Sequence, residues 1–363
     1  MALRKRAGAS SSPNVKVWVQ SSKGAPARRP FFCYGCRLDD EMVIEMKRVF
    51  IDGEAGTTGL LIRDRIVGRR DIELLQIDPA KRKDAAERKR LLNAADIVFL
   101  CLPDDAAIEA VSLIDNPDTV VIDGSTAFRV ADGWTYGFPE MTKDHRAAVA
   151  ASKRISNPGC YPTGTIALVR PLVDAGILPA DFPLTVNAIS GYSGGGKGMI
   201  AEFEDAQAPV TSEQPFRLYG LTLAHKHVPE MQVYGGLDHK PLFSPAVGRY
   251  RQGMLVEVPV QLWSLKSDAT PTRIRDVLAE RYAGERFVSV ASGEETAAIA
   301  NIDPEGLNHT NEMKLFVFGN EATEQVRLVA LLDNLGKGAS GAAVQSMNLV
   351  LGLDEATGLV PNA

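Results

Sequence analysis

The sequence predicts an α/β protein with a parallel sheet in its first half. Short apolar strands alternate with helical segments between residues 47 and 123, and this alternation is typical of parallel sheets. The second half contains longer strands and fewer helices. The 363 residues, 45% hydrophobic and 23% charged, are sufficient for about two globular domains.

The expected elements can be placed in order from their apolar patterns. In the first half, strands are expected over residues 47–51, 72–77, 96–102 and 119–123. Helices are expected between these strands. One follows the glycine turn after the first strand and runs through about Ile66, and two others are expected over residues 81–90 and 104–114. In the second half, strands are expected over residues 184–190, 255–265, 314–320 and 326–332, followed by a buried helix over 339–351.

The first residues differ from the rest of the chain. Residues 1–38 carry eight Lys or Arg and no acidic residue, so residues 1–45 are predicted to be a disordered basic leader. It is either a transit segment or sequence upstream of the true start at Met46. Cys33 and Cys36 have neither a second cysteine pair nor a nearby histidine, so no metal site is predicted. The uneven cysteines favour a reducing compartment, and we expect a cytoplasmic protein.

Charge and hydropathy exclude two classes of partner. The net charge is −5, from 40 basic and 45 acidic residues, which argues against a nucleic-acid or anionic membrane surface. The apolar run over residues 97–102 is far shorter than the ~20 residues of a membrane span. The sequence therefore predicts a small-molecule partner.

A glycine turn follows the first expected strand. Residues 53–59 (GEAGTTG) place three glycines between a strand and a helix, where a pyrophosphate can approach backbone N–H groups at the helix N-terminus. The expected cofactor contacts in this turn are Gly53, Gly56, Thr57, Thr58 and Gly59. Asp78 ends the second expected strand, where an acid binds a ribose 2′-hydroxyl and favours NAD, whereas the basic residues 81–83 favour a 2′-phosphate. Local sequence leaves NAD and NADP open.

Cys160 is the candidate nucleophile. It lies in residues 156–165 (SNPGCYPTGT), ahead of an apolar helical run. Pro162 suits a first helical turn, so the thiol is expected at a helix N-terminus, where the macrodipole lowers the pKa of a cysteine. Cys101, inside an apolar strand, is expected to be structural.

A cysteine nucleophile requires a proton acceptor, and two histidines form the natural candidate. His225 and His227 lie at i and i+2, on one face of an extended segment, with Glu230 available to orient one of them. Metal binding by the pair is the alternative, but the sequence shows no third ligand. Spacing does not decide which histidine transfers the proton, and His227 is the narrow choice.

Two further segments favour an anionic substrate. Residues 191–198 (GYSGGGKG) combine backbone donors with Ser193 and Lys197, as in a phosphate or carboxylate nest. This loop is not a P-loop, because Gly198 replaces the hydroxyl residue that binds magnesium. Arg129 follows a strand end at the sheet edge where ligands collect, and is a candidate phosphate contact.

Together these blocks resemble the N-acetyl-γ-glutamyl-phosphate reductases, most closely their shorter second type, from Met46 to the C-terminus. The matching blocks are residues 53–59, 123–129 (DGSTAFR), 157–163 (NPGCYPT), 191–197, 225–230 (HKHVPE) and 333–345. The resemblance implies a Rossmann-type NAD(P)-binding domain plus an α+β catalytic domain with a mixed sheet. The implied boundaries are 46–160 for the NADP-binding domain, 161–332 for the catalytic and dimerisation domain, and 333–363 for a C-terminal helix that returns to the NADP-binding domain.

The resemblance also implies an activity, namely NADPH-dependent reduction of an acyl phosphate in arginine biosynthesis through a thioester on Cys160. His225 or His227 would transfer the proton. A homo-oligomer, dimer or tetramer, is expected. The implied substrate and phosphate contacts are Arg129, Asn157, Ser193 and Lys197. The implied cofactor contacts in the last segment are Asn334 and Gly341.

Three other interpretations remain as alternatives. Another phosphorylating enzyme, such as aspartate-semialdehyde dehydrogenase, would share the cysteine chemistry, but the HKHVPE block argues against it. A short-chain dehydrogenase would need Tyr-x-x-x-Lys, which this chain lacks. A non-enzymatic NADP-binding redox regulator would keep the glycines but would not require the thiol, the histidine pair and the anion loop together.

Overall fold

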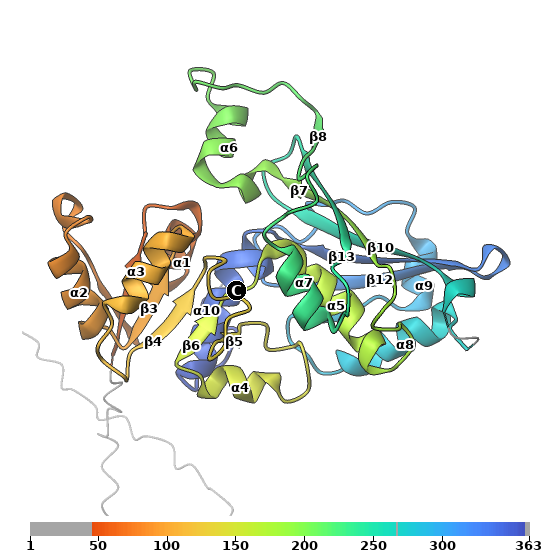
Figure 1. The fold of residues 1–363 in the computed structure, drawn as a ribbon, viewed down its shortest axis with the longest axis horizontal. Helices are drawn as coiled ribbons and strands as arrows, with labels where there is room; N and C mark the ends of the chain where they lie inside the picture. Colours follow the sequence, from red (N-terminus) through yellow and green to blue (C-terminus); the bar gives the residue numbers. More distant parts are fainter. Residues whose placement is uncertain (1–45, 266–267, 360–363) are drawn as a thin grey trace, which may run out of the picture. The chain divides into compact units, whose positions relative to one another are not determined.

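The computed structural model describes residues 46–265 and 268–359, and the predicted α/β class is confirmed. Two sheets form the framework, and helices pack against them (Figure 1). The expected leader, residues 1–45, and its two cysteines lie outside the described residues. In the two described ranges, no helix combines the length and apolar content needed to cross a bilayer.

The first sheet, sheet A, has six parallel strands in the order β2-β1-β3-β4-β6-β5. Their bounds are β1 Lys47–Asp52, β2 Ile72–Leu75, β3 Ile97–Leu100, β4 Val120–Asp123, β5 Thr135–Tyr136 and β6 Arg154–Ser156. Because β1, β3 and β4 are parallel neighbours, their carboxyl ends meet at one edge of the sheet. Ligands bind at this edge in open α/β sheets.

Helices cover both faces of sheet A because its strands alternate apolar side chains between the two faces. They are α1 Thr57–Ile66, α2 Ala85–Ala94, α3 Asp104–Ser112, α4 His145–Ala151 and α10 Gly341–Val350. Val49 and Ile51 of β1 belong to the apolar cluster of α1, α4 and α10. Phe50, between them, belongs to the cluster of α2 and α3 on the opposite face.

The C-terminal helix α10 completes the core of sheet A. Ala343, Val344 and Met347 of α10 are buried in the same cluster as Ile62 of α1 and Val149 of α4. A π-helical turn, η5 Gly336–Ser340, precedes α10. The first sheet is therefore stabilised by a segment from the far end of the chain (Figure 1).

The second sheet, sheet B, has seven strands in the order β11-β12-β13-β10-β7-β9-β8. Their bounds are β7 Thr185–Gly191, β8 Phe216–Leu218, β9 Leu242–Gly248, β10 Met254–Gln261, β11 Val288–Val290, β12 Met313–Asn320 and β13 Gln325–Leu332. The pairs β11/β12 and β7/β9 are parallel and the other neighbours are antiparallel. The predicted mixed sheet is confirmed.

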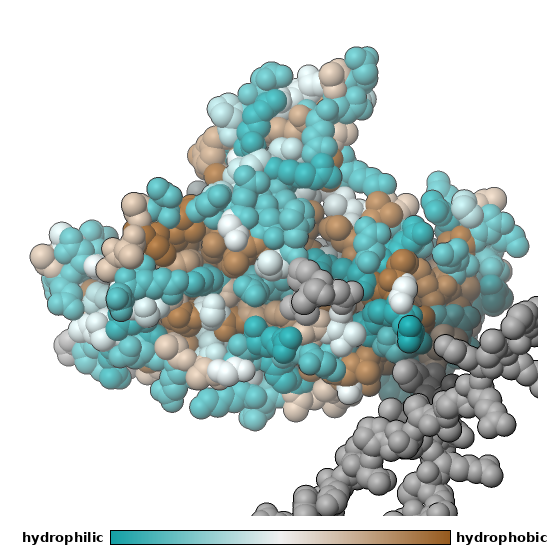
Figure 2. All heavy atoms as spheres, turned by 180° about the vertical axis from the view of Figure 1, so that it is seen from behind, coloured by the Kyte–Doolittle hydropathy of each residue, from teal (hydrophilic) through white to brown (hydrophobic). Residues whose placement is uncertain are grey.

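The two faces of sheet B are covered unequally. Three helices, α5 Cys160–Asp174, α7 Val228–Gly235 and α8 Pro271–Arg281, enclose the main core on one face. The other face carries α9 Gly293–Ala298, a smaller apolar cluster and a cavity of about 710 Å³ lined by Ile189, Leu255 and Val329. Viewed from behind, the molecule shows apolar patches among hydrophilic surface (Figure 2).

A projecting arm extends from sheet B. After β7, the 3-10 turn η2 Tyr192–Gly195 leads into α6 Gly196–Glu204, and the chain then returns to the edge strand β8. In Figure 1 this arm stands away from both sheets. Ion pairs between Arg217 and Glu202 and between Arg251 and Glu204 link it to β8 and to the segment before β10.

Candidate active site

A cavity of about 410 Å³ brings together the chemical residues that the sequence singled out. Its lining comes from the edge of sheet A, the start of α5, the η2 turn, the segment before α7 and the turn before α10. The predicted residues that line it are Thr57, Thr58, Arg129, Cys160, Ser193, His225, His227 and Asn334. The larger cavity over sheet B contains none of these residues, so the candidate site is the smaller one.

The glycine turn has the geometry of a dinucleotide-binding turn. Gly53 has φ +86°, and a Cβ there would lie 2.3 Å from the carbonyl oxygen of Cys101. A Cβ on Gly59 would lie 2.7 Å from the carbonyl oxygen of Gly53. Gly56 is the N-cap of α1, and the hydroxyl of Thr57 has no hydrogen-bond partner among the described residues. Close packing and unpaired donors at a helix N-terminus fit a bound pyrophosphate.

Cys160 is the first residue of α5, as expected, and is partly exposed in the cavity. Burial raises the pKa of its thiol to about 11, although the charge of Arg129 and the N–H of Tyr161 oppose this rise. The net direction is opposite to the fall expected from a helix N-terminus, because desolvation of the thiolate outweighs the macrodipole. A thiol with this pKa requires a nearby base to ionise at neutral pH.

The two histidines line the same cavity as this thiol and are neutral near pH 7. His227 is the buried N-cap of α7, and burial, followed by the charge of Arg129, lowers the pKa of its imidazole well below the usual value. Burial and the charge of Lys226 lower the pKa of His225 to about 4. The backbone N–H of His227 donates to Nδ1 of His225 at 3.1 Å. Both imidazoles can therefore accept a proton.

Gly159 explains how close these groups can come. A Cβ on Gly159 would lie 2.6 Å from Nη1 of Arg129, 2.7 Å from Oε1 of Glu230 and 2.8 Å from Nε2 of His227. Only glycine leaves this space free. The NPGC turn therefore places the guanidinium, the carboxylate and the imidazole against the residue that precedes Cys160.

Glu230 does not orient a histidine through any hydrogen bond of the described residues, contrary to the interpretation of its sequence position. Its buried carboxylate accepts from Nη1 of Arg129 at 2.6 Å, from the hydroxyl of Tyr136 at 2.7 Å and from the N–H of Gly159 at 3.1 Å. Arg129 also donates to the carbonyl of Gly124 at 3.2 Å. Its Nε has no partner in the described ranges, so this buried cation retains a donor for a ligand.

Five other predicted contacts differ in their placement. Ser193 and Asn334 are buried in the cavity wall, and Nδ2 of Asn334 donates to Oγ of Ser193 at 3.0 Å. Lys197 is exposed on α6, outside the set of described residues that line the cavity. Asn157 and Gly341 also lie outside that set.

Asn157 and Gly341 have structural contacts instead. Nδ2 of Asn157 donates to the carbonyl of Ala339 at 3.0 Å, which ties the NPGC turn to η5. Gly341 packs so closely that a Cβ would lie 2.2 Å from Oδ1 of Asn311. Asn157 therefore supports Ala339, a residue of the cavity wall, from behind.

Asp78 lies beyond β2, which ends at Leu75 rather than at residue 77. Its carboxylate caps the turn η1 Pro79–Lys81 by accepting from the N–H of Ala80 at 2.9 Å. The exposed basic residues 81–83 follow directly. This arrangement leaves cations available beside an acid that already has a backbone partner.

Three contributors to the site had no clear sequence signal. Tyr136 binds Glu230 from the short strand β5. Gly338 lines the cavity, and a Cβ there would lie 2.8 Å from Cβ of Cys160. The hydroxyl of Tyr219 lies in the same wall and donates to that of Tyr161 at 2.9 Å. Of these three, only Gly338 lies in a glycine-rich sequence, which could have indicated that the backbone there packs closely against another residue.

Two family models match this chain. Residues 54–149 match the model described as semialdehyde dehydrogenase, NAD binding domain, and residues 160–334 match semialdehyde dehydrogenase, dimerisation domain. Residues 54–59 of the glycine turn thus lie in the region that matches an NAD-binding domain, and Cys160 begins the second matched region.

Two relatives decide the family. The N-acetyl-gamma-glutamyl-phosphate reductase 2 of Nostoc sp. is 52% identical over 318 residues, which are 86% of this chain and 99% of the relative. The N-acetyl-gamma-glutamyl-phosphate reductase of Brucella anthropi is 55% identical over 306 residues, 84% of this chain and 98% of the relative. This chain belongs to the N-acetyl-γ-glutamyl-phosphate reductase family.

Solved structures show that this reductase-family chain shares its fold with aspartate semialdehyde dehydrogenases. Aspartate semialdehyde dehydrogenase II from Vibrio cholerae, complexed with ASA, has a TM-score of 0.60 at 15% identity and covers 84% of this chain and 98% of its own. The Candida albicans enzyme with NADP has a TM-score of 0.56 at 14% identity, with the same coverage of both chains. At this identity the similarity concerns the fold alone.

Proposed function

We propose that this chain catalyses the NADPH-dependent reductive dephosphorylation of N-acetyl-L-glutamyl 5-phosphate to N-acetyl-L-glutamate 5-semialdehyde, a step of arginine biosynthesis. The observation that carries the proposal is the cavity in which Cys160, His227 and Arg129 meet the N-terminus of α1. The names of the relatives supply the substrate. The expected oligomer remains part of the proposal, with the thinly covered face of sheet B as its contact surface.

The cofactor fits the glycine turn, and the proposed contacts are Gly53, Gly56, Thr57, Thr58 and Gly59, with Asn334 from the opposite wall. Close backbone packing at Gly53 and the unpaired Thr57 hydroxyl support this assignment. The exposed basic residues 81–83 support NADP, because a 2′-phosphate binds cations and Asp78 is already engaged by Ala80. When bound, the reduced nicotinamide supplies the hydride for the reduction.

Gly53→Ala tests the glycine turn, with Gly68→Ala as the matched control. Both residues have positive φ, +86° and +82°, so either substitution costs about 1 kcal/mol in backbone strain. A Cβ on Gly68 meets nothing within 4 Å, whereas one on Gly53 meets the backbone of Cys101. We expect only Gly53→Ala to raise the Kd for NADPH, by about tenfold or more, in a fluorescence titration. Equal effects would exclude a role of the turn in binding.

Cys160 provides the covalent step. Its thiolate attacks the acyl carbon, the C–O bond to phosphate breaks, and inorganic phosphate leaves with the bonding electron pair. The product is a thioester on Cys160. After reduction of the thioester carbon, the tetrahedral oxyanion takes up a proton and becomes a hemithioacetal hydroxyl. When the C–S bond breaks, this hydroxyl gives its proton back to the neighbouring imidazole, and the aldehyde and the thiolate are released.

The surrounding residues move protons and bind charge. His227 is neutral, so it can accept the proton of the Cys160 thiol and later return a proton to the oxyanion. Arg129 is buried with its charge held by Glu230, and its free Nε is the proposed donor to the departing phosphate. Ser193 is a second proposed phosphate contact.

Arg129→Lys tests the phosphate contact. Lysine keeps the charge but cannot reproduce the planar fork that contacts Glu230 and Gly124 while leaving Nε for a ligand. Because a hydrogen bond to a charged group contributes about 1.5–3 kcal/mol, we expect kcat/KM for phosphate to fall by about 10- to 100-fold. Lys240→Ala, an exposed cation outside the residues that line the cavity, is the control and should change it by less than about twofold. The reverse assay below measures both.

The reverse reaction tests the proposed function directly. NADP⁺ reduction is followed by absorbance with N-acetylglutamate 5-semialdehyde and inorganic phosphate, in parallel with aspartate semialdehyde and with NAD⁺. We expect phosphate-dependent turnover with the acetylated substrate. Turnover with aspartate semialdehyde instead would mean that the substrate is not the acetylated compound. Nucleotide binding without any turnover would favour a non-enzymatic regulator.

A further inference from the structure

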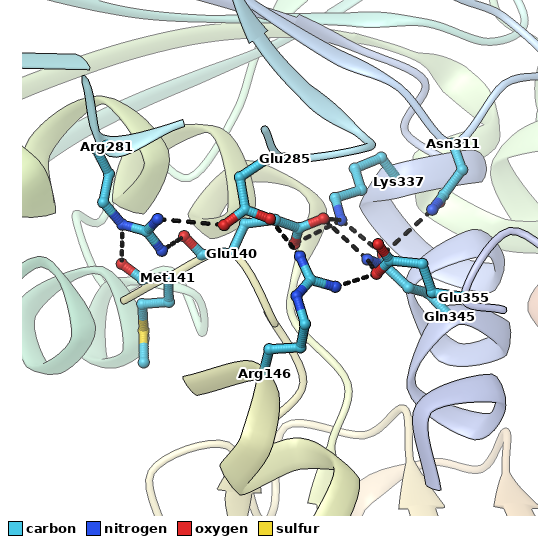
Figure 3. Close-up of polar contacts among 9 residues, drawn as sticks. All are labelled: Glu140, Met141, Arg146, Arg281, Glu285, Asn311, Lys337, Gln345 and Glu355. Carbon is cyan, nitrogen blue, oxygen red and sulfur yellow. Dashed lines mark hydrogen bonds and ion pairs between the residues drawn. The ribbon is translucent and has the colours of Figure 1, made fainter. Parts of the chain in front are cut away.

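A lysine of the turn η5 is completely buried beside the active site. The side chain of Lys337 has 0% exposure, and its ammonium donates to both carboxylate oxygens of Glu140, at 2.7 and 2.8 Å, and to Oε1 of Gln345 at 2.7 Å. These three acceptors satisfy all three N–H groups of a lysine. In Figure 3, dashed lines mark the bonds from Lys337 to Glu140 and to Gln345.

The partners of Lys337 extend into a network of buried and half-buried charges. Gln345 donates to Oε2 of Glu355 at 3.0 Å, and Arg146 pairs with both Glu355 and Glu285. Arg281 joins Glu285 at 3.2 Å and also donates to the carbonyl of Glu140. The members come from α4 and the segment before it, from α8 and the segment after it, and from the C-terminal segment (Figure 3). The network thus joins three separate parts of the chain.

The backbone next to Lys337 forms a wall of the active site. Gly338 touches Cys160, because a Cβ on Gly338 would lie 2.8 Å from Cβ of Cys160. Ala339 lines the cavity and accepts a hydrogen bond from Asn157 of the NPGC turn at 3.0 Å. The residues from 336 to 340 form a π-helical turn, a conformation that is rare and frequent at functional sites.

A buried ion pair is a poor source of stability. Removing two charges from water costs about as much free energy as their attraction returns, and well-packed apolar replacements are often neutral or stabilising. The pair of Lys337 and Glu140, both with 0% side-chain exposure, therefore calls for a reason other than stability. A fully satisfied network specifies one arrangement of the backbone that carries it.

We propose that Lys337 is a positioning residue, whose bonds to Glu140 and Gln345 hold the π-helical turn, and with it Gly338, against the thiol of Cys160. The proposal rests on the proposed function in one respect, that Cys160 is the nucleophile. Without these bonds the turn withdraws, because Lys337 is the side chain that ties its centre to the segment before α4. The thiol then loses the wall that fixes its direction and gains exposure to water.

Two opposite effects follow from withdrawal of the turn. Turnover falls because Cys160 no longer points reproducibly at the acyl carbon. Alkylation of Cys160 by iodoacetamide becomes faster, and the midpoint of its pH profile shifts to lower pH, because burial is what raises the pKa of this thiol. The Leu278→Ala control described below separates these two changes from a general loss of stability.

The experiment compares the double variant Lys337→Met/Glu140→Leu with wild type and with Leu278→Ala. The double variant removes both charges and leaves no unpaired ion, so it is designed to fold. Leu278, completely buried in α8, lies outside the network, and its truncation lowers thermal stability through a core cavity. The measurements are thermal unfolding, kcat and KM in the reverse assay, and the alkylation rate of Cys160 against pH by mass spectrometry.

For the double variant we expect kcat to fall at least tenfold, KM for NADP⁺ to stay within twofold, and alkylation at pH 7 to rise at least threefold. Leu278→Ala should lower the melting temperature and leave both thiol reactivity and kcat near wild type. A folded double variant with wild-type kcat and alkylation profile overturns the proposal. Because alkylation is measured without substrate, this result is distinct from a failure of the proposed function, in which wild type itself shows no turnover.

Gln345→Met decides the matter if the double variant does not fold. It removes one acceptor of Lys337 and retains the ion pair with Glu140. We expect the same two changes in smaller measure, with kcat reduced about threefold and alkylation faster. A folded Gln345→Met enzyme with unchanged kcat and alkylation also overturns the proposal.

Discussion

Cys160→Ser is expected to reduce turnover by about 10³-fold or more, because a serine hydroxyl at this position cannot be ionised by a neighbouring imidazole as readily as a thiol. Binding of the cofactor should be unchanged, since the glycine turn is built from sheet A and α1. The fold should also be preserved, because the substitution replaces one atom at the start of α5. The reverse assay measures turnover, and circular dichroism and NADPH titration measure fold and binding.

Cys101→Ser is the matched control for this variant. Cys101 directly follows β3, and burial, with the negative charges of Asp123 and Asp52, raises the pKa of its thiol to about 12. We expect this variant to retain turnover within about threefold, and we expect iodoacetamide to modify Cys160 in preference to Cys101. Substantial turnover in Cys160→Ser would exclude a thioester on this residue.

His227→Asn is expected to lower kcat by about 10²- to 10⁴-fold, the range contributed by general acid–base catalysis. Burial and the charge of Arg129 keep the pKa of this imidazole well below its usual value, so at neutral pH it is unprotonated and can accept the thiol proton. Asparagine cannot. As pH rises toward the pKa of Cys160, about 11, the thiol ionises without a base, and the rate of Cys160 alkylation in the variant should approach that of wild type.

His225→Asn distinguishes the two imidazoles. Nδ1 of His225 accepts the backbone N–H of His227, so His225 is assigned the orienting role and its loss should cost about tenfold or less. Asparagine retains an acceptor oxygen for that N–H. If His225→Asn instead gave the larger loss of kcat, and if alkylation of Cys160 in that variant reached the wild-type rate only near the pKa of the thiol, the two roles would be exchanged.

The fold was predictable where apolar periodicity is strong. The strands at β1, β3 and β4 are apolar on both faces, which only a parallel sheet covered by helices accommodates. The short strands β5 and β6 were not predicted, because two or three residues carry too little pattern. Strand β2 ends at Leu75 rather than at residue 77, because the chain must turn into Pro79. The strand expected to end at residue 265 ends at Gln261, where a 3-10 turn begins.

The site was predictable in its residue types but less so in their pairing. The position of Cys160 at a helix start follows from local sequence, whereas the direction of its pKa shift depends on burial, which a single sequence does not reveal. Glu230 is close to the histidines in sequence but binds Arg129 and Tyr136, about 100 residues away. Lys337 and Glu140 are separated by 197 positions, so no local pattern could indicate that this lysine is buried.

Helix α10 has a consequence for biosynthesis of the protein. The ribosome completes the strands of sheet A long before it makes Ala343, Val344 and Met347, which fill one face of that sheet. Until the last residues emerge, the nascent nucleotide-binding domain exposes apolar side chains of α1 and α4 to water. The core of this domain therefore closes only after α10 has been made, and a chain that stops before residue 341 leaves its first domain, as well as its active site, unfinished.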